Sequence, residues 1–382
     1  MANIMGYLDW RGDLTFEQSE FNEIDNLILS RLVYVDLEGI VAGPESKEKI
    51  TVEDASRIFF ETHDEDEIMK RVSMTKNSMY VLKKMAETNR FKNAKLFGYV
   101  NDIDREEQSQ FSVVCVLLED KSIYVAFSGT DDSIIGWREN FNMGFLSETP
   151  GQLKAVEYLN SMIRIGQRQV RVGGHSKGGN LAVYASVKCR SYIKKKIIAV
   201  YSNDGPGFSH KMVNSEEYQE MLPKIKTILP ESSIVGMLLE HEESFEVVKS
   251  SNNGVMQHDA MSWELLGTGF LPADNLAIQS IVVDETVKNW IKQLDLKQRE
   301  QLVETVFSML EDLNIRTVDE FYHRKWKVIQ EVMKAKSTLP PDTQELFSKA
   351  IKLFWKTGND TVKQYVKEKM ENTKRTENLK KI

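Results

Sequence analysis

An α/β fold with a mainly parallel sheet, followed by an all-helical region, is predicted by three observations on the 382-residue sequence. Short apolar runs alternate with helical segments between about residues 97 and 249, as strands and helices do in βαβ units. A G-x-S-x-G pentapeptide, residues 174–178, joins one such run to one such segment. After about residue 282 only amphipathic helical periodicity remains.

The expected elements follow the chain in order. The first 40 residues are rich in aromatic residues and contain a helical pattern over 24–32, and 41–46 is expected to be a loop. A charged stretch over 51–92 has apolar residues at helical spacing and indicates helices inserted beside the sheet. The expected strands cover 97–100, 112–118, 122–127, 169–172, 197–201, 226–229 and 245–249, and the expected helices around the pentapeptide cover 153–165 and 180–187.

The pentapeptide consists of Gly174, His175, Ser176, Lys177 and Gly178. A sharp strand-to-helix turn needs glycines around the serine, because a Cβ there would clash with the neighbouring strand or helix. Such a turn presents the hydroxyl of Ser176 above the sheet, and the N–H of Lys177 at the helix N-terminus can donate to an oxyanion. About one chain in ten of this length contains the pentapeptide by chance. Its place between a strand and a helix therefore carries the prediction that Ser176 is a nucleophile.

His258 is the expected base among the four histidines that follow Ser176. When a nucleophile elbow carries a triad, the chain order is serine, acid, histidine, and the histidine lies in a loop beyond the last strand. His258 follows both the last expected strand and the turn-forming residues 251–254. The alternative is an ordinary surface-loop histidine. Of the other three, His210 comes too soon after the serine, His241 lies in an acidic run, and His323 lies in a helical region.

Asp204 is expected to orient the base. It comes just after the strand over 197–201, and a carboxylate at the C-terminal end of a parallel strand faces the rim of the site. The alternative is that Asp204 only shapes a tight turn with the glycine and proline that follow it. Glu231 and Glu240, which come after the next strand, are further candidates for the same role.

A second oxyanion donor is expected in the loop after the strand over 122–127. Gly129 allows a close turn there, and Thr130 or Asp131 could reach the substrate oxygen through a backbone N–H. A plain transition from strand to loop is the competing interpretation.

Together these residues resemble a known family. Phe127 to Thr130, the following Trp137, the elbow over 174–178 and the late His258 are similar to the class 3 (fungal-type) lipases. A bacterial family of unknown function placed beside those lipases is a closer resemblance, carried by Tyr7 to Asp13, by Phe21, Asn22, Glu23 and Asp25, and by Ser202 to Phe208.

The resemblance covers roughly residues 1–275 and implies an α/β-hydrolase fold that hydrolyses acyl esters with a serine, an acid and a histidine. It also implies an oxyanion hole formed by the threonine after Gly129 and the residue after Ser176. Class 3 lipases carry the acid just before an apolar stretch that follows a strand. The similar place here, Ser232 to Val235, has no aspartate, which shifts weight to Asp204.

Composition sets several classes aside. The net charge of −7 argues against a nucleic-acid binder, and the sequence has no P-loop and no zinc-type spacing of Cys and His, so neither a metal nor an organic cofactor is expected. The two cysteines, the absence of a signal-peptide pattern and the lack of a long apolar run favour the cytoplasm. Cys115 lies in an apolar run and is expected to be a buried thiol.

Two parts are expected: an α/β-hydrolase domain over 1–281, with the helical insertion at about 51–92, and a helical region over 282–382. The helical region could cover the pocket or form an oligomer interface, and its lysine-rich tail over 363–382 allows at most a weak membrane contact. The expected function is a serine hydrolase that cleaves a small-molecule or lipid acyl ester through an acyl-enzyme. The alternative is a hydrolase-like scaffold that binds a lipid or a protein partner with little or no turnover.

Overall fold

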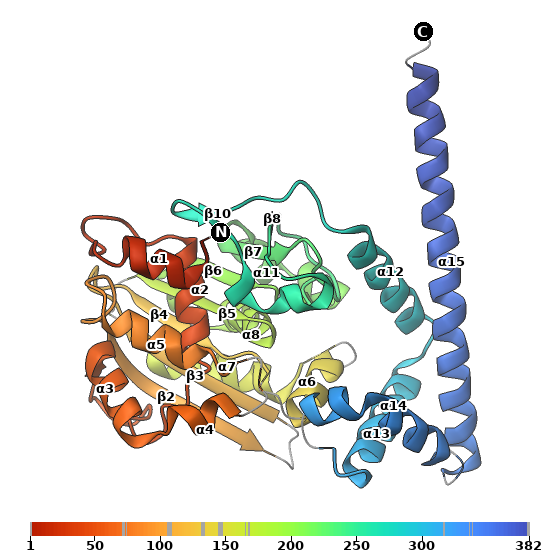
Figure 1. Ribbon diagram of the computed structural model, residues 1–382, viewed down its shortest axis with the longest axis horizontal. Helices are drawn as coiled ribbons and strands as arrows, with labels where there is room; N and C mark the ends of the chain where they lie inside the picture. The colour runs from red at the N-terminus through yellow and green to blue at the C-terminus, as the bar shows by residue number, and fades with distance from the viewer. Residues whose placement is uncertain are drawn as a thin grey trace.

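One mixed sheet runs through the molecule, with helices on both faces (Figure 1). The computed structural model describes residues 2–379 except 71–72, 74, 105–108, 131–133, 144–147, 165, 167–168, 316–317, 336 and 338. Within these residues the strand order is the chain order, antiparallel from β1 to β4 and parallel from β4 to β8. The strands are β1 (Ile50–Thr51), β2 (Lys95–Asp104), β3 (Ser109–Leu117), β4 (Ile123–Phe127), β5 (Val170–His175), β6 (Ile197–Asn203), β7 (Ile225–Pro230) and β8 (Phe245–Val248).

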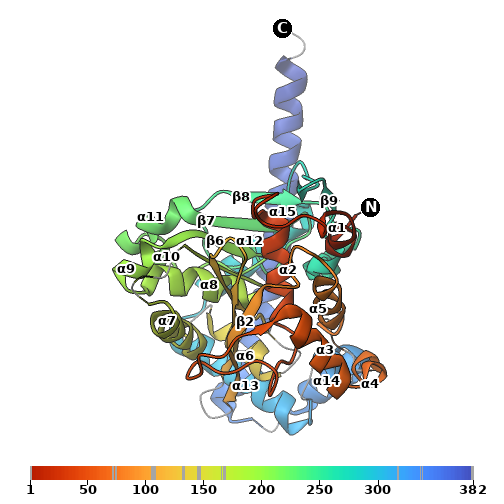
Figure 2. The same ribbon diagram turned by 90° about the vertical axis from the view of Figure 1, so that its left-hand side faces the viewer.

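Two layers of helices cover this sheet, and Figure 2 shows them on opposite sides of it. The first layer is α1 (Ile4–Arg11), α2 (Glu23–Leu32), α3 (Val52–Thr62), α4 (Glu65–Lys70) and α5 (Ser78–Ala86). The second is α7 (Pro150–Met162), α8 (Lys177–Lys188), α9 (Ser191–Lys194), α10 (His210–Val213) and α11 (Glu216–Met221). Shorter elements follow: η1 (Leu222–Lys224), η2 (Gly254–His258), η3 (Ala260–Ser262), β9 (Leu265–Leu266) and β10 (Gly269–Phe270).

The interior strands β3 and β4 are apolar on both sides because both helical layers pack on them. Val114 and Val116 belong to the core under α1–α5, whereas Val113 and Cys115 belong to the core under α7 and α8. This is the period-two alternation of a strand buried on both faces. The predicted α/β class with a mainly parallel sheet is therefore confirmed, and Cys115 is a buried strand residue.

A buried ion pair fastens α2 in the first layer. Asp25 closes the capping box of α2 by accepting from the Asn22 N–H at 2.9 Å. It also accepts from Arg90 Nε at 2.7 Å and from Arg90 Nη2 at 2.5 Å, and both side chains are fully buried. The remaining guanidinium donors reach backbone carbonyls of the segment between α1 and α2, including those of Ser19 and Glu20. One arginine thus joins the loop after α5 to the start of α2.

After the sheet the chain is helical, in α12 (Ile278–Lys292), α13 (Leu296–Asp312), α14 (Val318–Ala335) and α15 (Pro341–Leu379). α12 packs on α15, where Trp290 donates from Nε1 to the Ala350 carbonyl at 2.9 Å. α13 contacts α6 (Ile134–Met143), which follows β4. The C-terminal part of α15 extends past the other elements in both views. No helix among the described residues is both long and apolar enough to cross a membrane.

The Asp25–Arg90 pair gives a stability prediction. R90M leaves a fully buried carboxylate without its partner, so we expect the free energy of unfolding to fall by about 3–5 kcal/mol. Urea denaturation measures the change. K226M is the matched control, because it removes the partly exposed Lys226–Glu23 pair, and it should cost less than about 1 kcal/mol. Equal losses in the two variants would contradict the role given to Arg90.

Candidate active site

The pentapeptide forms a strained turn between β5 and α8. β5 ends at His175 and α8 begins at Lys177, and the serine between them has φ 57° and ψ −132°, a conformation rare for residues with a side chain. A Cβ on Gly174 would clash with the Gly178 backbone, and one on Gly178 would clash with the Phe127 carbonyl. Both glycines are thus required by close backbone approach. Ser176 lies at the C-terminal edge of the sheet and is 7% exposed.

The structure brings Asp204 and His258 together from two separate loops. His258 Nδ1 lies 2.6 Å from Asp204 Oδ2, and the carboxylate is fully buried. The other oxygen, Oδ1, accepts from the Ser233 hydroxyl and from the Gly236 N–H, the latter at 3.1 Å. Asp204 also has φ 50°, so it shapes the turn after β6 and pairs with the histidine at once. The two interpretations of this residue are compatible.

The two glutamates weighed for the same role lie elsewhere. Among the described residues, neither Glu231 nor Glu240 forms a hydrogen bond or an ion pair with His258. The backbone of Glu240 pairs with Phe208, and that of Glu231 pairs with Val248. Of the three carboxylates, only Asp204 meets the histidine.

Ser233 explains how the acid can occupy this place. The resemblance to class 3 lipases implies an acid at the place where this chain has Ser232 and Ser233, which follow β7. Here the Ser233 hydroxyl donates to the carboxylate of Asp204, which arrives from the end of β6. The carboxylate is therefore supplied one strand earlier, and the serine takes the space beside it.

The His258 ring lies beside the elbow that carries Ser176. Within the described part of the chain, no hydrogen bond joins Ser176 Oγ to the His258 ring. The His258 ring does lie over the elbow, with its centroid 4.7 Å from that of the His175 ring. Contacts of this kind are often long without substrate and tighten when substrate binds.

Two segments at the elbow can offer donors to an oxyanion. The N–H of Lys177 is in the first turn of α8, where no intrahelical carbonyl can accept it. The loop after β4 runs against the same turn, since a Cβ on Gly129 would lie 2.6 Å from the His175 carbonyl oxygen and 3.0 Å from Ser176 Cβ. Thr130 is the next residue and is half-buried. Asp131, the other candidate, falls outside the described residues.

His175 is a site residue that sequence reasoning did not single out. Its Nε2 lies 2.7 Å from the backbone carbonyl of His258, and its Nδ1 lies 3.1 Å from the Tyr34 hydroxyl. A carbonyl only accepts, so Nε2 carries the proton and Nδ1 accepts from Tyr34. Burial holds the pKa of His175 well below the usual histidine value. A neutral imidazole therefore fastens the backbone of His258 to the elbow.

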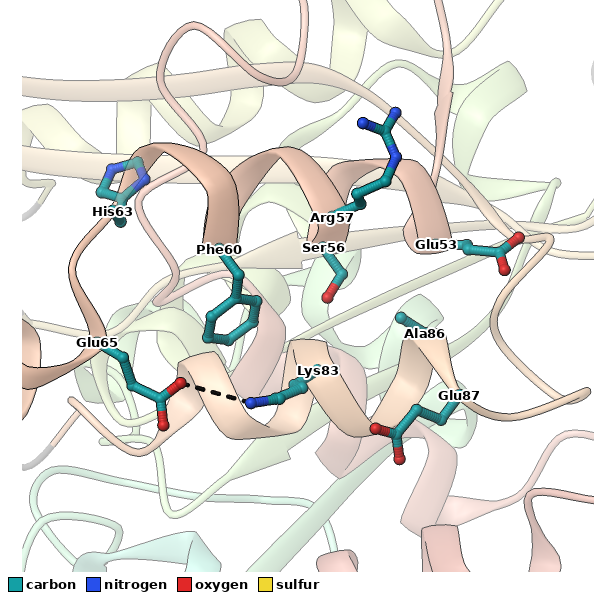
Figure 3. Close-up of a pocket in the computed structure, with 9 residues that line it drawn as sticks. All are labelled: Glu53, Ser56, Arg57, Phe60, His63, Glu65, Lys83, Ala86 and Glu87. Atoms are coloured by element: carbon teal, nitrogen blue, oxygen red, sulfur yellow. Dashed lines mark hydrogen bonds and ion pairs between the residues drawn. The ribbon is translucent and has the colours of Figure 1, made fainter.

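Two surface grooves lie away from these residues. The groove in Figure 3 has a volume of about 390 Å³ and runs between α3 and α5. Two of its cations are already paired: Lys83 with Glu65 at 3.4 Å, and Arg57 with Asp54 and Glu61 at 3.3 Å each. Neither this groove nor its neighbour beside α1 is lined by the serine, the aspartate or the histidine. Neither groove belongs to the candidate site.

The buried neutral His175 predicts how stability depends on pH. Below the ordinary histidine pKa of about 6.5, the unfolded chain binds a proton that the folded chain does not. The free energy of unfolding therefore decreases as the pH is lowered, by up to about 1.4 kcal/mol per pH unit. H175Q keeps an amide donor for the His258 carbonyl and should remove this part of the slope in urea titrations at neutral and mildly acidic pH. H210Q, at an exposed position, is the control. An unchanged slope in H175Q would show that His175 does not cause it.

Known proteins resemble this chain over the part that contains the elbow. A family model described as Mbeg1-like matches residues 85–308, which include the elbow, Asp204 and His258. Among solved structures, the crystal structure of M37 lipase is similar at 14% identity and a TM-score of 0.36, over 57% of this chain and 70% of that chain. No curated protein matches the chain. The family model covers more than half of the sequence, so the chain belongs to the Mbeg1-like family, a lipase-like family of α/β hydrolases. The expected resemblance to a lipase-related family is thereby confirmed.

Proposed function

We propose that this protein is a serine hydrolase that cleaves a small-molecule or lipid acyl ester through an acyl-enzyme. The lipase-like family and the fold support an ester hydrolase in general. The observation that carries the finer proposal is the 2.6 Å contact of His258 Nδ1 with the buried carboxylate of Asp204, on loops that flank the elbow of Ser176. A carboxylate at this nitrogen fixes the tautomer and leaves Nε2 as the base.

The proposed reaction has two steps. Ser176 Oγ attacks the ester carbonyl while His258 Nε2 takes its proton, and Asp204 stabilises the imidazolium that forms. The N–H of Lys177 and a donor at Thr130 hold the tetrahedral oxyanion. His258 then protonates the departing alcohol, which leaves an acyl group on the serine. Water, deprotonated by the same histidine, cleaves this acyl-enzyme, releases the acid and restores the serine.

Covalent labelling tests the nucleophile. A fluorophosphonate should add one adduct to the wild-type protein, seen by intact mass, because an activated serine displaces fluoride from phosphorus. S176A should add none. A wild type that stays unlabelled from mildly acidic to mildly alkaline pH would favour the alternative, a scaffold that binds a lipid or a protein partner without turnover.

Kinetics on an activated ester test the acid. D204N keeps the size of the side chain but can donate to His258 and favour the wrong tautomer, so kcat should fall by about 10³–10⁴-fold. E240Q is the matched control, because Glu240 follows the next strand and does not contact His258 in the described structure. Its kcat should stay within about twofold of the wild type. If E240Q lost as much activity as D204N, the assignment of the acid would be wrong.

A further inference from the structure

The residue after the proposed nucleophile carries a buried charge. The side chain of Lys177 is 0% exposed, and its ammonium is buried between β3 and α6. Nζ donates to Glu139 Oε2 at 2.7 Å, to Gln110 Oε1 at 2.8 Å and to the Gln110 carbonyl at 2.5 Å. An ammonium has three N–H donors, so all of them are satisfied.

Glu139 joins this ammonium to three further elements. It lies on α6 and is 1% exposed, and its Oε2 also accepts from the Gln110 N–H on β3 at 3.2 Å. Its Oε1 accepts from the Gly151 N–H at 3.0 Å, in the first turn of α7, where the helix dipole favours a negative charge. One ion pair therefore links α6, α7 and β3 to the first residue of α8.

Stability alone is a weak reason for such a pair. Removing two charges from water costs several kcal/mol per ion, and apolar side chains of similar volume often stabilise a fold as well or better. What the pair does add is a fixed position for α6. Thr130 lies only four residues before the start of α6 in the chain, so the place of α6 bears on the place of Thr130 relative to Ser176.

We propose that the side chain of Lys177 is a positioning residue: its ion pair with Glu139 holds α6, and with it the loop that carries Thr130, at the distance from Ser176 that the oxyanion requires. This rests on the proposed serine-hydrolase function and gives Lys177 two tasks. Its backbone N–H faces the oxyanion, and its side chain sets the place of the donor on the opposite loop. Neither task depends on the other chemically, because the ammonium itself does not touch the substrate.

Three variants test the proposal on an activated short-chain ester: K177M, E139Q and the double variant K177M/E139Q. Removing one oxyanion donor outright costs about 10²–10³ in kcat, so misplacing one should lower kcat by about 10- to 100-fold in all three. KM should change by less than about threefold, since the loss falls on the transition state. The single variants leave a buried charge unpaired and should melt at lower temperature. The double variant leaves none, so its melting temperature should recover while its kcat does not.

The control is D120N, which weakens the part-buried Asp120–Arg171 pair at the start of β5, the end of that strand opposite to Ser176. It should lose stability and keep its kcat. The double variant decides the matter where a single variant fails to fold. Wild-type kcat in that double variant, or a loss of kcat in D120N as large as in K177M, overturns the positioning role alone. A wild-type protein that neither hydrolyses esters nor takes the fluorophosphonate label overturns the proposed function, and the positioning role with it.

Discussion

The strained backbone at Ser176 is the constraint on which the site depends, because such a conformation persists only where its surroundings hold it. The Ser176 N–H donates to the Asn203 carbonyl at 2.9 Å, and Asn203 Nδ2 donates to the Gly174 carbonyl at 3.0 Å. Asn26 on α2 donates to Asn203 Oδ1 at 2.9 Å and accepts from Tyr124 on β4 at 2.7 Å. A buried polar network from α2, β4 and β6 thus locks the turn from below, where each unsatisfied group would be costly.

Above this network, the first turns of α8 organise the loops on both sides of the elbow. Lys177 reaches Glu139 on α6, which follows the loop of Thr130. Asn180, one turn later on the same helix, donates to the carbonyl of Pro206 at 3.0 Å and to that of Gly207 at 2.9 Å. Those two residues continue the loop that begins with Asp204. A single helix start therefore fixes the serine and holds two loops that flank it, so the geometry of the site is a property of one rigid element.

The sequence was sufficient where the signal is local. The strands around the elbow have either alternating apolar and polar residues or continuous apolar runs, and these patterns predict the fold class. The fixed spacing of the glycines and the serine predicts Ser176 as a candidate nucleophile. The pairing of Asp204 with His258 was the hypothesis of choice among three carboxylates, and only the fold shows which one meets the histidine. The roles of His175 and of the Lys177 side chain had no such signal, because their partners lie far away in the chain. Tyr34 follows the end of α2 and Glu139 lies on α6, and no local pattern specifies how these segments pack.

The helical region after the sheet contacts α6, the helix that Lys177 at the elbow also holds. Arg138, next to Glu139 on α6, forms ion pairs with Glu304 and Glu311, which lie seven residues apart on α13 and hence on one face of that helix. Adjacent residues on a helix point about 100° apart, so α6 can present a carboxylate to the elbow and a guanidinium to α13 at the same time. α6 is therefore clamped from both sides. Under the proposed positioning role of Lys177, α13 is therefore a second element, besides the elbow, that holds α6 in place, and it does so through the two ion pairs of Arg138.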